Sequence, residues 1–139
     1  MNAPYSLRRI AILVIAPACL ATLTSLIVSK PDGRKISIED ALGYSNALWI
    51  DARSAEDFEK NHHEGAIHLN LSNWDRQLPE FLAQWELDQA VIIYCGSDDC
   101  QSSLQVAIRL QEAGVSPLHI LHGGWEALQR IKANKTPLP

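Results

Sequence analysis

Apolar and polar positions alternate so that most of the chain is predicted to form short strands separated by helices. The run 90–94 is β-branched, aromatic and nearly all apolar, which predicts a strand buried on both faces at the centre of a sheet. Other strands are predicted over 47–52, 65–71 and 118–121. Helices are predicted over 37–44, 54–60, 74–85 with Pro79 as a kink or break, 102–113 and 125–133. This alternation favours an α/β fold, a parallel sheet with helices on both faces.

The amino-terminal part of the chain has a different pattern. Ile10 to Val28 is a run without a charged residue, long enough for a helix to cross a bilayer core of about 30 Å. We expect a single transmembrane or signal-anchor helix here, with residues 1–9 as a tail and 29–35 as a linker. Removal of the segment as a signal peptide is the alternative. A signal anchor has its amino terminus inside, so we expect the folded domain, 36–139, to lie outside the cytoplasmic membrane. Basic residues flank the apolar run on both sides, so the charge pattern barely decides its orientation.

Composition narrows the range of functions. The 139 residues have room for one domain, and 47% hydrophobic with 20% charged residues is ordinary for a globular protein. The net charge is −4, and the basic residues before position 36 leave the folded part still more acidic, which argues against a nucleic-acid partner. The five histidines show no ligand spacing, so neither a metal site nor another cofactor is expected.

Candidate chemistry gathers at the predicted strand ends. Asp51, Cys95 and His122 each end or follow a strand, and in such sheets the ligand site lies beyond the carboxyl ends of the strands. Cys95 also begins a loop that leads into a helix, whose amino terminus presents N–H groups and partial positive charge. These features lower a thiol pKa and indicate a nucleophilic cysteine, with a buried structural cysteine as the alternative.

Several motifs in order resemble the rhodanese family. They are Trp49-Ile50-Asp51-Ala52-Arg53-Ser54 with Phe58, the segment Asn61 to Ile67, Ile93-Tyr94-Cys95 and Leu121 to Trp125. The resemblance covers about 36–139 and implies a rhodanese-like fold. It also implies that Cys95 takes a sulfane sulfur from a small donor, holds it as a persulfide and passes it to a thiol or other nucleophilic acceptor. The implied active-site loop continues through Gly96, Ser97, Asp98, Asp99, Cys100 and Gln101, with Asp51, Arg53 and His62 as framework residues.

The loop departs from the family pattern in its charge. Rhodaneses that use thiosulfate commonly carry arginine or lysine here, whereas this loop carries Asp98 and Asp99. Because carboxylates repel a dianionic donor and oppose thiolate formation, efficient use of thiosulfate is not expected. Phosphatase activity is not expected either, because Cys100 and Gln101 stand where related phosphatases place an arginine.

Two other functions remain open. Cys100 could resolve a persulfide or sulfenate on Cys95 as a disulfide, which would make the domain a thiol redox module. The domain could also be a non-catalytic binding module with a protein partner. The sequence does not indicate the donor, the acceptor, the oligomeric state or whether the two cysteines pair.

Overall fold

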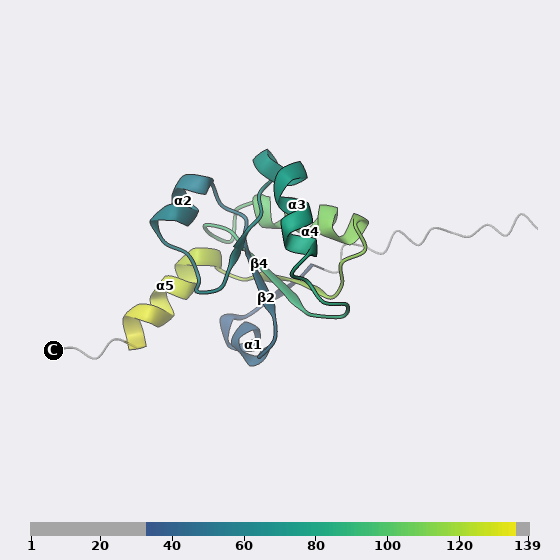
Figure 1. Ribbon diagram of the computed structural model, residues 1–139. Helices are drawn as coiled ribbons and strands as arrows, with labels where there is room; N and C mark the ends of the chain where they lie inside the picture. The colour runs from purple at the N-terminus through teal and green to yellow at the C-terminus, as the bar shows by residue number, and fades with distance from the viewer. Residues whose placement is uncertain (1–32, 136–139) are drawn as a thin grey trace, which may run out of the picture.

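The computed structural model describes residues 33–135, which form a five-stranded sheet covered by helices (Figure 1). All neighbouring strands are parallel, in the order β1-β5-β4-β2-β3. The strands are β1 (Arg34–Ile36), β2 (Leu48–Asp51), β3 (Ile67–His68), β4 (Val91–Tyr94) and β5 (Leu118–Leu121). The central strand β4 is fully buried, which confirms the position predicted from its β-branched and aromatic sequence.

Helices pack on both faces of the sheet. They are α1 (Ile38–Gly43), α2 (Ala55–Lys60), α3 (Trp74–Leu82), α4 (Ser102–Glu112) and α5 (Gly124–Lys135), with a 3-10 turn, η1 (Leu71–Asn73), before α3. One core joins the sheet to α3 and α4 through Ile93, Phe81 and Val106. The other joins the opposite face to α1 and α5 through Ile92 and Leu128. In Figure 1, α3 and α4 lie above the strands, α1 lies below them and α5 lies to their left.

Helix starts follow from local chemistry, as predicted. The hydroxyl groups of Ser37 and Ser54 accept hydrogen bonds from the backbone N–H of Asp40 and Asp57, both at 3.1 Å. These bonds satisfy donors that have no partner inside the helix. The cap at Ser54 starts α2 directly after Arg53, so the backbone turns away from the sheet just beyond β2.

Three predicted elements differ from the structure. Strand β3 is limited to two residues because the side chain of Asn70 accepts from the Asn73 N–H at 3.1 Å and starts η1. Pro79 lies inside α3 without ending it, and the buried residues Trp74 and Phe81 hold the helix against the sheet. Part of the expected linker, residues 34 and 35, belongs to β1, which pairs with β5 at the sheet edge.

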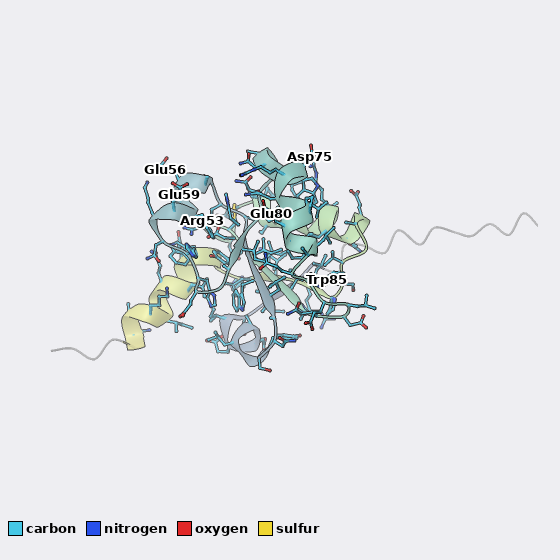
Figure 2. All side chains as sticks on the ribbon, viewed as in Figure 1. Arg53, Glu56, Glu59, Asp75, Glu80 and Trp85 are labelled. Atoms are coloured by element: carbon cyan, nitrogen blue, oxygen red, sulfur yellow. A yellow bond between two sulfur atoms is a disulfide. The ribbon has the colours of Figure 1, made fainter. Side chains whose placement is uncertain are left out.

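The predicted membrane-spanning segment, Ile10 to Val28, lies outside the described residues. Among residues 33–135, no helix has the length and apolar character needed to cross a membrane. The acidic side chains of Glu56 and Glu59 on α2 and of Asp75 and Glu80 on α3 are exposed and point away from the sheet (Figure 2).

Candidate active site

The carboxyl ends of the strands carry the predicted site residues at one edge of the sheet. Asp51 ends β2, Cys95 follows β4 and His122 follows β5, and these three strands are neighbours in parallel register. Cys95 begins the β4–α4 loop, residues 95–101, which leads to the start of α4 at Ser102. The topology therefore brings the predicted loop and framework residues to the same edge.

Cys95 and Cys100 form a disulfide across the β4–α4 loop. Their Cα atoms are 6.3 Å apart, within the range that a disulfide spans. The loop is thus long enough to bring the two sulfurs together, which the sequence left open. Cys95 is 1% exposed, whereas Cys100 is only partly buried. Cys95, predicted as the nucleophile, is therefore covered by the protein in the disulfide form.

The first residues of α5 hold the start of this loop. The N–H of Trp125 donates to the carbonyl oxygen of Cys95 at 2.7 Å, and the N–H of Glu126 donates to the carbonyl oxygen of Gly96 at 3.2 Å. Gly124 has φ +51° and packs directly on the backbone of Cys95, so no side chain fits there. The motif Gly123-Gly124-Trp125 therefore positions the backbone of the candidate nucleophile.

Asp98 ties the middle of the loop to its surroundings. Its carboxylate accepts from the Gly123 N–H at 2.9 Å and from Nδ1 of His122 at 2.8 Å, and Nζ of Lys35 lies 3.5 Å away. The Gly123 amide, helped by the charges of His122 and Lys35, lowers the pKa of Asp98. Asp98 is therefore a loop anchor with nearby positive partners, whereas Asp99 is exposed.

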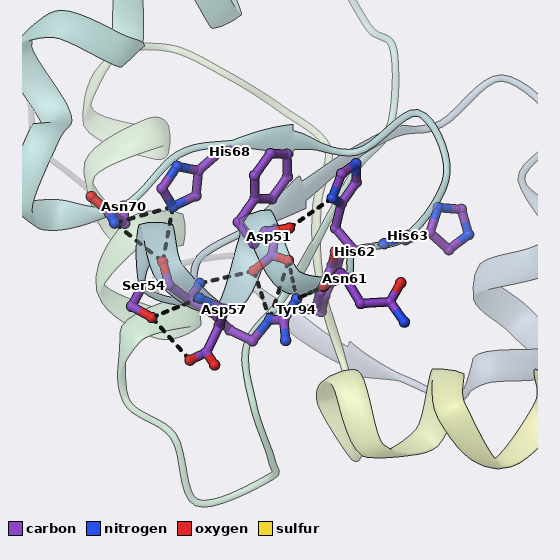
Figure 3. Close-up of polar contacts among 11 residues, drawn as sticks. Asp51, Ser54, Asp57, Asn61, His62, His63, His68, Asn70 and Tyr94 are labelled. Atoms are coloured by element: carbon purple, nitrogen blue, oxygen red, sulfur yellow. Dashed lines mark hydrogen bonds and ion pairs between the residues drawn. The ribbon is translucent and has the colours of Figure 1, made fainter.

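A buried ion pair lies at the end of β2. Asp51 is completely buried, and Nη2 of Arg53 donates to its Oδ2 at 2.6 Å while Nε lies 3.0 and 3.1 Å from the two oxygens. The Arg53 backbone N–H also donates to Asp51 Oδ1 at 2.9 Å. Arg53 additionally donates to the carbonyl oxygen of Asn61 at 2.6 Å (Figure 3). The pair thus fixes the turn after β2 and the end of α2 together.

Arg53 also contacts aromatic side chains from the neighbouring elements. Its guanidinium lies 4.4 Å from the ring centre of Trp125 and 5.8 Å from that of Tyr94, next to Cys95 in the chain. Burial alone lowers the pKa of Arg53, but the hydrogen bonds and charge of Asp51 outweigh it and raise the pKa. Burial raises the pKa of Tyr94 above its ordinary value. The framework is therefore a permanently charged arginine beside a neutral phenol.

A second set of polar residues, which contacts the carbonyl oxygen of Arg53, was not predicted from the sequence. Gln77 accepts the Asn70 N–H through Oε1 at 3.1 Å, so its Nε2 donates to Nδ1 of His68 at 3.0 Å. His68 is then protonated on Nε2, which donates to the carbonyl oxygen of Arg53 at 3.0 Å. Asn70 donates to the same oxygen at 3.1 Å. The only sequence signal was the polar Gln77 on an otherwise apolar face of α3.

Two neighbouring histidines support the segment before β3. Nδ1 of His62, predicted as a framework residue, lies 2.8 Å from the carbonyl oxygen of Phe58, and its ring stacks on Phe58 at 4.0 Å. The backbone N–H of His63 donates to the Tyr94 hydroxyl at 3.0 Å, and its ring stacks on Trp49 at 4.2 Å. These hydrogen bonds and ring contacts hold the backbone and the rings of His62 and His63 in place, which is consistent with a structural role for both residues.

His63 is expected to make stability fall as the solution becomes acidic. Burial lowers the pKa of His63 below its ordinary 6.5, so the unfolded chain binds the proton more tightly than the folded one. Its contribution is complete above pH 6.5 and is lost as pH falls through the lower folded pKa. Urea unfolding midpoints measured between pH 7.5 and 5.5 are expected to decline less steeply for His63→Gln. Asp98→Asn is the control, because the pKa of Asp98 lies below this window; an unchanged slope in His63→Gln would contradict the assignment.

The predicted residues thus fall into three groups. Cys95 and Cys100 are the only sulfur atoms among the described residues, and they lie in the loop. Asp98 anchors this loop, and Asp51 and Arg53 hold the adjacent turn. His62 lies on the α2 side of the Asp51–Arg53 ion pair, and its ring stacks on that of Phe58. Chemically, the arrangement offers a reducible disulfide and, once it is reduced, two thiols at a rigidly held loop.

Comparison with protein families matches residues 37–131 to the rhodanese-like domain. Among curated proteins, thiosulfate sulfurtransferase GlpE of Actinobacillus succinogenes is 32% identical over 91 residues, covering 66% of this chain and 77% of that protein. The protein of the same name from Stutzerimonas stutzeri is 32% identical over 97 residues, covering 68% of this chain and 84% of that protein.

Solved structures share the fold at low sequence identity. A rhodanese-related protein from Thermoplasma volcanium is 16% identical with a TM-score of 0.51, covering 75% of this chain and 95% of that chain. A Saccharomyces cerevisiae homologue of single-domain rhodanese and the Cdc25 phosphatase catalytic domain is 15% identical with a TM-score of 0.56, covering 75% and 84%. These likenesses concern the fold alone.

Proposed function

Because the chain belongs to the rhodanese-like domain family, we propose that it is a sulfurtransferase that carries sulfane sulfur as a persulfide on Cys95. The names of the curated relatives at about 30% identity support sulfur transfer in general. The observation that carries the assignment to Cys95 is its place, at the carboxyl end of the central strand in a loop held by the α5 amides.

The reaction begins with the reduced protein, since the disulfide leaves no thiol on Cys95. The Cys95 thiolate attacks the sulfane sulfur of the donor, a new S–S bond forms, and the donor's bond to that sulfur breaks with its electron pair on the leaving group. A nucleophilic acceptor then attacks the outer sulfur of the Cys95 persulfide. The Cys95–sulfur bond breaks, and Cys95 leaves as a thiolate ready for another cycle.

Charge around the loop favours some donors over others. The carboxylate of Asp98 is engaged by Gly123, His122 and Lys35, but Asp99 is exposed and no lysine or arginine lies within 95–101. A dianion such as thiosulfate is therefore repelled more than a neutral or singly charged persulfide or polysulfide. We expect thiosulfate to react more slowly than a low-molecular-weight persulfide.

The test follows sulfur on the reduced full-length chain in detergent by intact mass. In a Cys19→Ser background, a persulfide donor is expected to add about 32 Da to the otherwise wild-type chain and to Cys100→Ser, and less to Cys95→Ser, whose remaining thiol is Cys100. Cys100→Ser is the matched control because it removes the neighbouring thiol of the same loop. A gain of sulfur in Cys95→Ser equal to that of the wild type would overturn the role of Cys95, and no gain in any protein would favour a binding module.

The disulfide supports a second candidate function, a dithiol redox module. Cys100 would attack the inner sulfur of the Cys95 persulfide, forming the Cys95–Cys100 bond while the outer sulfur leaves as hydrosulfide. An external thiol must then reduce the disulfide. This function differs from simple transfer in its product, because one hydrosulfide is released for each disulfide formed.

Sulfide release separates the two candidates. With a persulfide donor and no added acceptor, the redox function predicts that the wild type releases sulfide and loses about two hydrogens in mass. Cys100→Ser would retain the persulfide and release none. Equal sulfide release by wild type and Cys100→Ser would exclude the resolving role of Cys100 and leave transfer through Cys95 as the function.

We also propose that the domain is anchored to the membrane through Ile10 to Val28 and lies outside the cytoplasmic membrane. The uncharged apolar run supports this placement, and a resolvable disulfide suits an oxidising compartment. Fractionation after alkaline carbonate washing tests the anchor, and protease accessibility in intact and opened spheroplasts tests the side. Release of the chain by carbonate would contradict the anchor.

A further inference from the structure

The two sulfurs of the disulfide differ in access. Cys95 is covered by the protein, whereas Cys100 is partly exposed at the end of the loop, next to the first turn of α4. An attacking thiolate must approach a disulfide sulfur directly, opposite the sulfur that leaves. The difference in exposure therefore distinguishes attack on the sulfur of Cys100 from attack on the sulfur of Cys95.

A small cavity lies on the Cys100 side of the loop. Its volume is about 110 Å³, and Cys100, Ser97, Gln101 and Ser103 line it together with Lys35 and Asp98. Cys95 is not among the described residues that line it. The volume admits the reacting end of a small thiol and excludes a folded protein partner. The cavity thus leads a small molecule to Cys100.

Charges of both signs line the cavity on the Cys100 side. Lys35 on β1 is one of the lining residues, and α4 begins at Ser102, so its amino-terminal end, with partial positive charge, lies next to the loop end that carries Cys100. Asp98 also lines the cavity, but its carboxylate is held by the Gly123 amide and by His122. Lys35, whose Nζ lies 3.5 Å from Asp98, is the cation among the described residues that line the cavity, and we expect it to influence the approach of charged thiols.

We propose that Cys100 is the sulfur through which low-molecular-weight thiols reduce the closed site. This step rests on the proposed function, since it regenerates the Cys95 thiolate that sulfur transfer requires. The thiolate attacks Sγ of Cys100, an S–S bond forms between the thiol and Cys100, the Cys95–Cys100 bond breaks, and its electron pair leaves with Cys95. A second thiolate attacks the sulfur of the bound thiol, releases the Cys100 thiolate and leaves as a small disulfide.

The mixed disulfide formed as an intermediate identifies which of the two cysteines the small thiol attacks. The oxidised full-length chain in detergent, with Cys19→Ser to remove the remaining thiol, is mixed with 2-mercaptoethanesulfonate, quenched with acid within milliseconds to seconds, and alkylated at low pH. Peptide mass mapping is expected to place the mixed disulfide on Cys100 and the alkyl group on Cys95. The reverse placement, or no trapped mixed disulfide while reduction proceeds, would overturn the proposal.

Single-cysteine variants provide a second measurement that needs no trapped intermediate. In the same Cys19→Ser background, reduced Cys95→Ser, which keeps Cys100, is expected to react with dithionitrobenzoate at least ten times faster than reduced Cys100→Ser, which keeps Cys95. Equal rates, or a faster Cys95, would overturn the proposal. Persulfide formation on Cys95 is measured separately on the reduced protein, so failure of this inference leaves the proposed function testable on its own.

Charge reversal on β1 tests the path through the cavity. Lys35→Glu is expected to lower the ratio of reduction rates for the anionic 2-mercaptoethanesulfonate over the cationic cysteamine by roughly three- to tenfold. Arg34→Glu is the matched control, because Arg34 is the preceding residue of the same exposed strand and lines a different cavity. A ratio that changes equally in both variants would place the attack elsewhere.

Discussion

Replacement of Arg53 by alanine is expected to lower the free energy of unfolding by about 3–5 kcal/mol, the usual cost of leaving a buried charge without its partner. Asp51 is completely buried, and the Arg53 side chain is 8% exposed. Without the guanidinium, the buried carboxylate of Asp51 keeps the backbone N–H of residue 53 and the hydroxyl group of Tyr94 as hydrogen-bonding neighbours, and no cation. The variant also loses the contacts of Arg53 with Trp125 and with the carbonyl oxygen of Asn61.

Urea unfolding monitored by circular dichroism measures this loss. Lys60→Ala is the control, because the Lys60–Glu56 pair is as short, 2.6 Å, but its side chains are 66% and 78% exposed. An exposed pair of this kind is worth about 0.3–0.5 kcal/mol. The double variant Asp51→Asn/Arg53→Met is expected to recover much of the loss, since neither charge remains. A loss in Arg53→Ala no larger than in Lys60→Ala would mean that the ion pair does not stabilise the turn.

Gly124→Ala is expected to slow the formation of the Cys95 persulfide by about 10- to 100-fold, as small displacements of a reacting group do. The added Cβ would collide with the carbonyl oxygen of Cys95 and lie 3.1 Å from its carbonyl carbon. The residue also has φ +51°, a conformation that alanine adopts only with strain. The backbone of the loop must therefore move away from α5, which breaks the hydrogen bond from Trp125 to Cys95.

Gly96→Ala is the matched control for this substitution. Gly96 lies in the same loop, but nothing lies within 4 Å of the position of an added Cβ, and its φ is not positive. It is expected to change the rate less than threefold, about 0.6 kcal/mol. Intact mass measures persulfide formation, and the rate of Cys95–Cys100 closure under an oxidant gives a readout that does not depend on sulfur transfer. Equal rates in Gly124→Ala and Gly96→Ala would show that the contact of Gly124 with Cys95 does not determine the loop geometry.

Much of the fold was predictable because its signals are local. The apolar run of β4 and the serine caps of α1 and α2 each act within a few residues. Strand β1 was missed because it is a three-residue edge strand with only Ile36 buried, and its stability comes from pairing with β5, far along the chain. Pro79 was predicted as a kink or break, and the helix continues through it because Phe81 is buried against the sheet, which helix propensity alone does not take into account.

The features of the candidate site likewise fall into those that follow from the sequence and those that follow from the tertiary structure. The sequence by itself determined that Cys95 follows the central strand, that Asp51 ends its neighbour and that two aspartates replace basic residues in the loop, because these depend on order along the chain. Only the tertiary structure decided that Asp51 and Arg53 form a buried pair, that α5 holds Cys95, that Asp98 is drawn to Gly123 and His122, and that Cys95 is covered while Cys100 is accessible. Burial and hydrogen-bond partners are set by the packing of distant segments, which no local pattern encodes.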